Sequence, residues 1–205
     1  MLIDYLMLEG KDPFVIDANV PEGPLRAAFP GRTALVDFDQ IPGQMKLFDT
    51  IMGSIGRDYV VDIPASQTEK FFTAIKELDV LQEATRRGFQ FAILFLVDKE
   101  LASYDNAEDL RVALAPHAVI YVRNNYVGSF APPSSRELTI DIPPLDRDIF
   151  PYIEDRYFSY RAFLLGDEAA IPLKLVNKLK AFLLAMVTGL QDIEPELSLR
   201  RLRNL

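Results

Sequence analysis

The chain has 205 residues, 49% of them hydrophobic and 25% charged, with a net charge of −8 at pH 7. This composition is typical of one globular domain, and no apolar run is long enough to cross a bilayer. The lack of cysteine excludes a disulfide framework and thiolate metal sites, and the negative charge argues against a broad nucleic-acid surface.

The first ten residues predict an amphipathic helix. They mix apolar side chains with Asp4 and Glu9, and they lack the basic start and the cleavage site of a secretory signal. Without that signal and without cysteine, the sequence predicts a cytoplasmic protein.

Short apolar runs rich in Val, Ile and Phe then predict buried strands. The expected strands cover residues 14–17, 34–37, 59–62, 91–97, 118–123 and 138–142. Three of them end in an aspartate: Asp17, Asp37 and Asp62. Because the carboxyl ends of parallel strands share one edge of a sheet, we expect these aspartates at that edge, where α/β proteins bind ligands.

Stretches with helical spacing separate the strands. The expected helices cover residues 44–55, 68–87, 106–115 and 173–190, and Pro- or Gly-rich loops are expected at 21–24, 30–31, 131–133 and 143–144. This alternation predicts an α/β fold over residues 1–205: one domain in three α/β/α layers, with a mostly parallel sheet between the helices.

The pieces resemble, in order and spacing, the ParA/MinD class of P-loop NTPases. Residues 59–66, with Asp62 at the strand end and Pro64 two positions later, resemble the Walker B strand. Residues 2–19 are similar to the first helix, the Gly-Lys turn and the second strand of the class, which ends in Asp-x-Asp. Residues 119–124, 140–145 and 173–190 resemble the adenine-contacting strand, the proline turn past the base and the closing helix.

The resemblance implies that ATP and Mg²⁺ are the ligands, bound by a homodimeric switch ATPase of the partition, positioning or mobilisation type. Asp62 and Asp17 would then belong to the metal site. The nucleotide would lie near Pro64, Arg123, Asn124 and Pro143. In this class, the nucleotide-bound dimer engages DNA, a membrane or a protein partner.

Two departures from the class bear on activity. The Lys-Gly-Gly-x-Gly-Lys-Ser/Thr phosphate loop is missing from the sequence, as is the strand that leads into it. Asn19 replaces the aspartate that would orient the attacking water, and an amide cannot act as a general base at neutral pH. We therefore expect this chain to bind and hydrolyse ATP poorly.

The missing loop leaves two hypotheses open. The native protein begins upstream and is a complete ATPase, or Met1 is the true start and the fold is a non-enzymatic interaction module. A Rossmann- or flavodoxin-like enzyme is a third hypothesis, although no Gly-x-Gly-x-x-Gly follows a strand. A lost central strand would expose sheet edges, so a dimer or higher oligomer is expected.

Each candidate residue also has a structural alternative. Asp17, Asp62, Asp37 and Asp39 could cap the loops that follow their strands, and Asn124 could simply form a turn.

The remaining candidates are expected to be structural. His117 is expected in a solvated loop, and neither Ser66 nor Ser103 has the surroundings of a hydrolase nucleophile. An aromatic group is expected to fill a core or an interface: Phe150, Tyr152, Tyr157, Phe158, Tyr160 and Phe163. A solvated helix end is expected for Arg200, Arg201 and Arg203.

Overall fold

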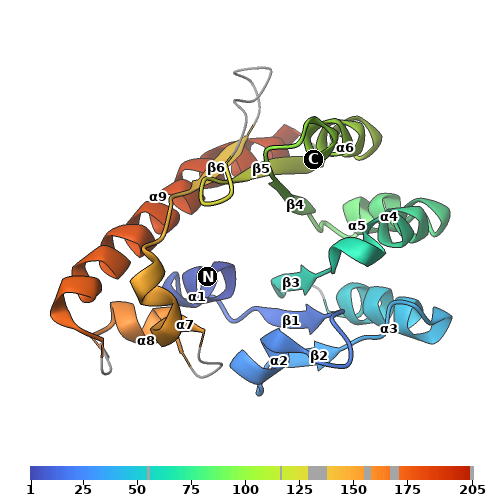
Figure 1. The fold of residues 1–205 in the computed structure, drawn as a ribbon. Coiled ribbons are helices and arrows are strands. Elements are labelled where there is room, and N and C mark those ends of the chain that lie inside the picture. Colours follow the sequence, from blue (N-terminus) through green and yellow to red (C-terminus); the bar gives the residue numbers. More distant parts are fainter. Residues whose placement is uncertain (55, 116, 129–137, 155–157, 167–170, 204–205) are drawn as a thin grey trace. The chain divides into compact units, whose positions relative to one another are not determined.

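The computed structural model describes residues 1–54, 56–115, 117–128, 138–154, 158–166 and 171–203 (Figure 1). The chain divides into two compact units, the first comprising Met1–Phe89 and Pro151–Ala169 and the second comprising Gln90–Phe150 and Ala170–Leu205. Each unit contains a three-stranded sheet in which neighbouring strands are parallel. The predicted α/β class and parallel pairing are confirmed. The predicted loop at 131–133 lies outside the described residues.

The sheet of the first unit has the order β2-β1-β3. β1 (Phe14–Asp17) lies in the middle, between β2 (Thr33–Leu35) and β3 (Tyr59–Asp62). Val15 and Ile16 of β1 have no exposed surface, which explains why this strand is apolar without alternation. Burying each such side chain contributes about 1.5–3 kcal/mol to folding.

The helices of this unit follow the predicted order, with differences at their ends. They are α1 (Leu2–Leu8), α2 (Pro24–Ala28), α3 (Ile41–Met52), the 3₁₀ turn η1 (Ala65–Gln67), α4 (Thr68–Glu77), α5 (Val80–Arg86) and α8 (Tyr160–Leu164). The short helices α2 and α8 were not predicted, and Pro24 of α2 falls in an expected loop. The helix expected over 68–87 is divided into α4 and α5, because Asp79 adopts a left-handed conformation with φ of 48°.

A buried carboxylate joins the two parts of the chain that form the first unit. Asp4 of α1, 2% exposed, accepts a hydrogen bond of 3.1 Å from the backbone N–H of Arg161 at the start of α8. The Ser159 hydroxyl accepts a second bond of 3.1 Å from the N–H of Ala162. These acceptors satisfy helix N–H groups that have no partner inside the helix.

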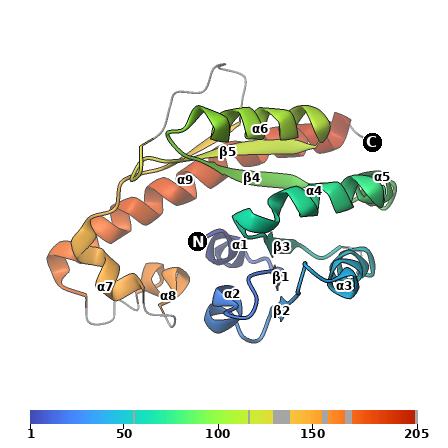
Figure 2. The ribbon, with the colours of Figure 1, turned by 45° about the vertical axis from the view of Figure 1, so that its right-hand side comes forward.

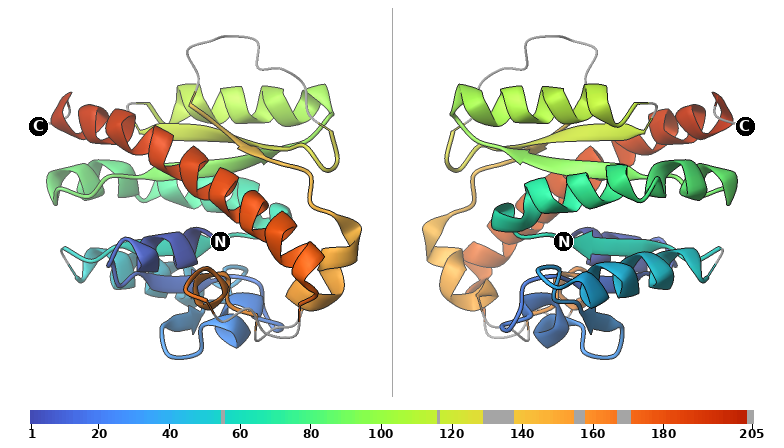
Figure 3. Two further views of the ribbon diagram at one scale, coloured as in Figure 1. Left: turned by 90° about the vertical axis from the view of Figure 1, so that its left-hand side faces the viewer. Right: turned by 90° about the vertical axis from the view of Figure 1, so that its right-hand side faces the viewer.

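The second unit has helices on both faces of its sheet, whose order is β4-β5-β6 (Figures 2 and 3). The strands are β4 (Ala92–Val97), β5 (Ala118–Asn124) and β6 (Thr139–Ile142), followed by the 3₁₀ turn η2 (Arg147–Ile149) and by α7 (Phe150–Ile153) at the boundary between the units. Helix α6 (Leu101–Ala113) packs on β4 and β5, where its Tyr104 stacks on Tyr121.

Helix α9 (Leu173–Arg203) packs on β6. A methyl group added at Gly189 of α9 would lie 3.3 Å from Cγ2 of Ile140, so the helix lies close to the strand. This helix is longer than the predicted 173–190 segment and contains Pro195. The expected solvation of the arginine side chains at 200, 201 and 203 falls outside the described side chains. Among the described residues, no helix combines the length and the apolar character needed to cross a membrane.

Candidate functional site

Two aspartates lie side by side at the carboxyl edge of the first sheet. Asp17 is the last residue of β1 and Asp62 is the last residue of β3, and the two are paired in the register of these parallel strands. Their position follows from the pattern of each strand, in which three apolar residues precede an aspartate. The structure therefore places both carboxylates within reach of a common ligand.

Asn19 bridges the two carboxylates. Its side-chain Nδ2 donates one hydrogen bond of 3.0 Å to Oδ1 of Asp17 and another of 2.9 Å to Oδ2 of Asp62. Both protons of the amide are thus used to hold negative oxygens. An aspartate at this position could donate neither bond, so the arrangement depends on the amide.

Asp17 is fully buried and also caps helix α2. Its Oδ2 accepts hydrogen bonds of 2.9 Å and 3.4 Å from the N–H groups of Leu25 and Arg26, and its Oδ1 accepts a second bond, of 3.0 Å, from the backbone N–H of Asn19. A carboxylate offers about four acceptor positions, and four donors contact this one. This agrees with the alternative in which Asp17 caps the following loop.

Asp62 is in a different electrostatic situation. Burial, and secondly the negative charge of Asp17, raise the pKa of the Asp62 carboxyl above its usual value, while the hydrogen bond from Asn19 opposes the shift. The ionised form of Asp62 is therefore poorly compensated in the folded protein. A bound cation would relieve this cost.

The donor set fits Mg²⁺ at one residue and not at the other. The Asp62 carboxylate accepts one hydrogen bond, from Asn19, and is otherwise poorly compensated, and carboxylate oxygen is the ligand type that Mg²⁺ prefers. Asp17 would have to release hydrogen bonds before it could bind a metal. In the described part of the chain, no cluster of three or more acidic or histidine side chains could hold an ion. The metal role of the two aspartates remains a prediction.

The acidic residues after β2 form a loop network of their own. Asp37 accepts a bond of 3.0 Å from the N–H of Asp39, and Asp39 accepts bonds from Lys70 at 2.5 Å and from Gln67 at 3.2 Å. The hydrogen bond from Lys70 is the main reason that the pKa of Asp39 is lowered. Pro64 directly precedes the 3₁₀ turn that contains Gln67.

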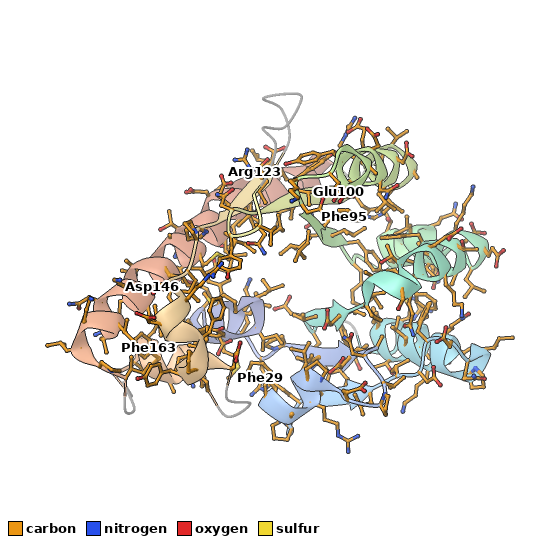
Figure 4. All side chains as sticks on the ribbon, viewed as in Figure 1. Phe29, Phe95, Glu100, Arg123, Asp146 and Phe163 are labelled. Atoms are coloured by element: carbon orange, nitrogen blue, oxygen red, sulfur yellow. The ribbon has the colours of Figure 1, made fainter. Side chains whose placement is uncertain are left out.

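The other three predicted site residues lie at the carboxyl edge of the second sheet. Arg123 of β5, which is labelled in Figure 4, forms an ion pair of 2.5 Å with Asp141 of β6. The side-chain oxygen of Asn124 accepts a bond of 3.1 Å from the N–H of Tyr126, which is the turn geometry of the structural alternative. Pro143 follows Ile142, the register partner of Asn124.

An aromatic group lies beside these residues. Tyr126 and Arg147 were not among the predicted site residues, and Phe150 was expected only in a core or an interface. The Tyr126 ring is 43% exposed, its centroid lies 5.7 Å from that of Phe150, and the Arg147 guanidinium carbon lies 5.9 Å from it. The three residues are dispersed along the sequence. The only signal available was an aromatic residue directly after an Asn-Asn turn.

The other candidates are structural where they are described. Phe163 is fully buried and contacts Phe158, whose ring also contacts Tyr160, in agreement with a core role. Tyr157 lies outside the described residues. The Ser103 hydroxyl accepts a bond from the N–H of Asp98, so it acts in a turn.

His117 corrects the prediction of a solvated histidine. It is 7% exposed and packs edge-on against Phe91, with ring centroids 5.8 Å apart. Among the described residues, no hydrogen-bond partner contacts its Nδ1. Proline before it suggested a loop, but the ring is enclosed where the chain enters β5. Burial lowers the pKa of His117 below its usual value.

We predict that this burial makes stability depend on pH near neutrality. Below the unfolded pKa of about 6.5, the unfolded chain binds a proton that the folded chain resists, so stability falls as pH falls. The slope from one group is at most about 1.4 kcal/mol per pH unit. Urea unfolding should show that the free energy of unfolding falls less between pH 7.5 and pH 5.5 in His117→Leu than in the unmodified chain. Equal losses would contradict the prediction.

These features define an α/β protein with a bridged carboxylate pair at the carboxyl edge of a parallel sheet. Comparison of the chain with models of protein families, with curated proteins and with solved structures finds no match.

Proposed function

We propose that the chain is a nucleotide-dependent switch protein of the ParA/MinD type, in a form that binds and hydrolyses ATP poorly. The proposal includes the three-layer P-loop NTPase-like architecture, a location in the cytoplasm and action as a homodimer with a protein partner. It is supported by the side-by-side position of Asp17 and Asp62 at the carboxyl ends of adjacent parallel strands. This is the edge at which α/β proteins of this kind hold phosphates and their metal ion.

The roles of the residues follow from their contacts. Asp62 would hold Mg²⁺, which when bound neutralises the charge of the nucleotide phosphates. Asp17 keeps α2 and the 18–23 loop in place by accepting bonds from their N–H groups. Asn19 holds the two carboxylates together. Because an amide does not remove a proton from water at neutral pH, the site supports binding better than hydrolysis.

The bridging amide also favours a second function, a non-enzymatic interaction module. If residue 19 were an aspartate, three neighbouring carboxylates would need a cation to offset their repulsion. With Asn19 at this position, hydrogen bonds alone hold Asp17 and Asp62 together. The site can therefore persist in a protein that has lost nucleotide chemistry. Nucleotide binding discriminates between the two functions.

Calorimetric titration of the chain with Mg-ATP should give weak, saturable binding that disappears in Asp62→Asn. The matched control is Asp58→Asn, which removes the same charge from an exposed position just before β3. This control should bind like the unmodified chain. The ATPase proposal is wrong if the unmodified chain does not bind Mg-ATP, or if Asp62→Asn binds Mg-ATP as tightly as Asp58→Asn does. The interaction module is then preferred.

Asp62→Asn should weaken Mg-ATP binding but increase the stability of the fold. The folded pKa of Asp62 is raised, so its ionisation destabilises the fold at pH values above that pKa. Asp62→Asn should therefore raise the melting temperature at pH 7, where an amide oxygen can still accept the bond from Asn19. The gain should shrink as pH falls through the folded pKa toward about 3.9, the unfolded value.

A further inference from the structure

Strand β4 forms one edge of the second sheet. Among the described residues it pairs only with β5. The N–H of Ala118 donates to the carbonyl of Phe91, so the backbone groups of residue 91 point toward β5. Successive residues of a strand direct these groups to alternate sides. The N–H and C=O groups of Ala92, Leu94 and Leu96 therefore point away from β5, toward the open edge.

The composition of β4 is unusual for an edge. Its sequence, Ala-Ile-Leu-Phe-Leu-Val, contains no charge, proline or glycine, and Leu96 is 65% exposed. Edge strands of soluble proteins are normally short or carry charges that prevent pairing. The opposite edge has that protection, because β6 has four residues and carries the exposed Asp141 (Figure 4 shows its partner Arg123). β4 has the character of a strand that pairs on both sides.

We propose that the open edge of β4 pairs with β4 of a second copy of this chain, antiparallel across a two-fold axis. The outward groups of residues 92, 94 and 96 fix the register. Leu94 lies opposite itself, and Ala92 lies opposite Leu96 of the second copy. All three positions are hydrogen-bonded pairs, which gives about six bonds across the axis.

The self-pairing register supports a second copy as the occupant. The net charge of −8 on each chain opposes association over most of the surface, so contact between copies is favoured only along a surface without charge. β4 is such a surface, and its flanking residues also avoid like-charge pairs in this register. Asp98 lies opposite Gln90, and Lys99 lies opposite Phe89. The pairing requires no nucleotide, so it is independent of the proposed function.

Sedimentation equilibrium without nucleotide should show a concentration-dependent dimer. Leu96→Lys adds a charge at the edge and should raise the dimer dissociation constant at least tenfold, by an estimate of roughly 1.4 kcal/mol or more. Val112→Lys is the matched control, because Val112 is 64% exposed and lies on α6 of the same unit. The control should dimerise like the unmodified chain. Circular dichroism verifies that both variants fold.

A cysteine cross-link tests the register directly. The chain has no cysteine, so Leu94→Cys can form a disulfide only between copies. Hydrogen-bonded antiparallel pairs have Cα atoms about 5.5 Å apart, within the range of disulfides. Oxidation should cross-link Leu94→Cys and leave Val112→Cys monomeric under denaturing conditions.

Three results would overturn the proposal: a monomer at every concentration, a Leu96→Lys dimer as tight as the unmodified one, or equal cross-linking at both positions. A monomer that binds an added extended apolar peptide would assign the edge to a foreign strand instead.

Discussion

Gly43→Ala should destabilise the protein by about 3 kcal/mol, the upper range for overpacking. Gly43 is the third residue of helix α3, and a Cβ atom there would lie 1.8 Å from the backbone oxygen of Asp37 and 2.7 Å from its carbonyl carbon. Both atoms belong to the backbone just beyond β2, so no side-chain rotation relieves the clash. The start of α3 must move away from the 36–39 loop.

Helix propensity alone predicts the opposite sign, because alanine is better than glycine by about 1 kcal/mol inside a helix. Thermal unfolding decides between these expectations. The melting temperature should fall by roughly 6–12 °C, since 1 kcal/mol corresponds to about 2–4 °C in a chain of this size. Gly31→Ala is the control, because a Cβ at Gly31 would contact nothing within 4 Å. Equal melting temperatures for the two variants would refute the close approach.

The strands could be predicted from the sequence because short apolar runs rich in Val, Ile and Phe are typical of buried strands. Five expected strands match β1, β3, β4, β5 and β6 to within two residues, and β2 is displaced by one or two. The break between α4 and α5 could not be predicted. Leu78 and Asp79 interrupt neither the apolar spacing nor the composition of the segment. Asp79 adopts a left-handed conformation although no glycine or proline marks a break at this position.

The division of the strands into two sheets was not predicted either. An apolar strand with helices on both sides has the same sequence pattern whether it lies at an edge or in the middle of a sheet. β4 illustrates this, because its sequence is that of an interior strand although only β5 pairs with it in the described residues. The sequence pattern fixes which residues form strands, but not how many neighbours each strand has.

The candidate site was predictable only in part, for a related reason. Asp17 and Asp62 could be placed together because each ends a parallel strand, and register then brings them into contact range. The bridging role of Asn19 depends on the path of the loop between β1 and α2, which no periodic pattern describes. The same loop aims the N–H groups of Leu25 and Arg26 at Asp17. Sequence identified Asn19 as a departure, but not as a hydrogen-bond donor to both aspartates.

Asn19→Asp is the substitution that tests this site most severely. It removes two hydrogen bonds to charged acceptors, each worth about 1.5–3 kcal/mol, and places a third carboxylate beside Asp17 and Asp62. Without divalent cations, we expect the variant to lose at least about 3 kcal/mol of stability, the lower sum for the two bonds before any repulsion is added. Asn19→Ala removes the same two bonds without adding charge, so the difference between the variants measures the repulsion alone.

Adding Mg²⁺ then tests whether the carboxylates at this edge can share one cation. Three carboxylates form the hard oxygen cluster that a divalent cation stabilises, and a ligand that binds only the folded state raises the melting temperature. If these carboxylates face one common ion position, Mg²⁺ should stabilise Asn19→Asp, with three carboxylates, more than Asn19→Ala, with two. Asn106→Asp controls for added charge at an exposed position on α6. If Mg²⁺ stabilises Asn19→Asp no more than this control, Asp17 and Asp62 serve the packing of the β1–α2 loop and not a metal-bound nucleotide.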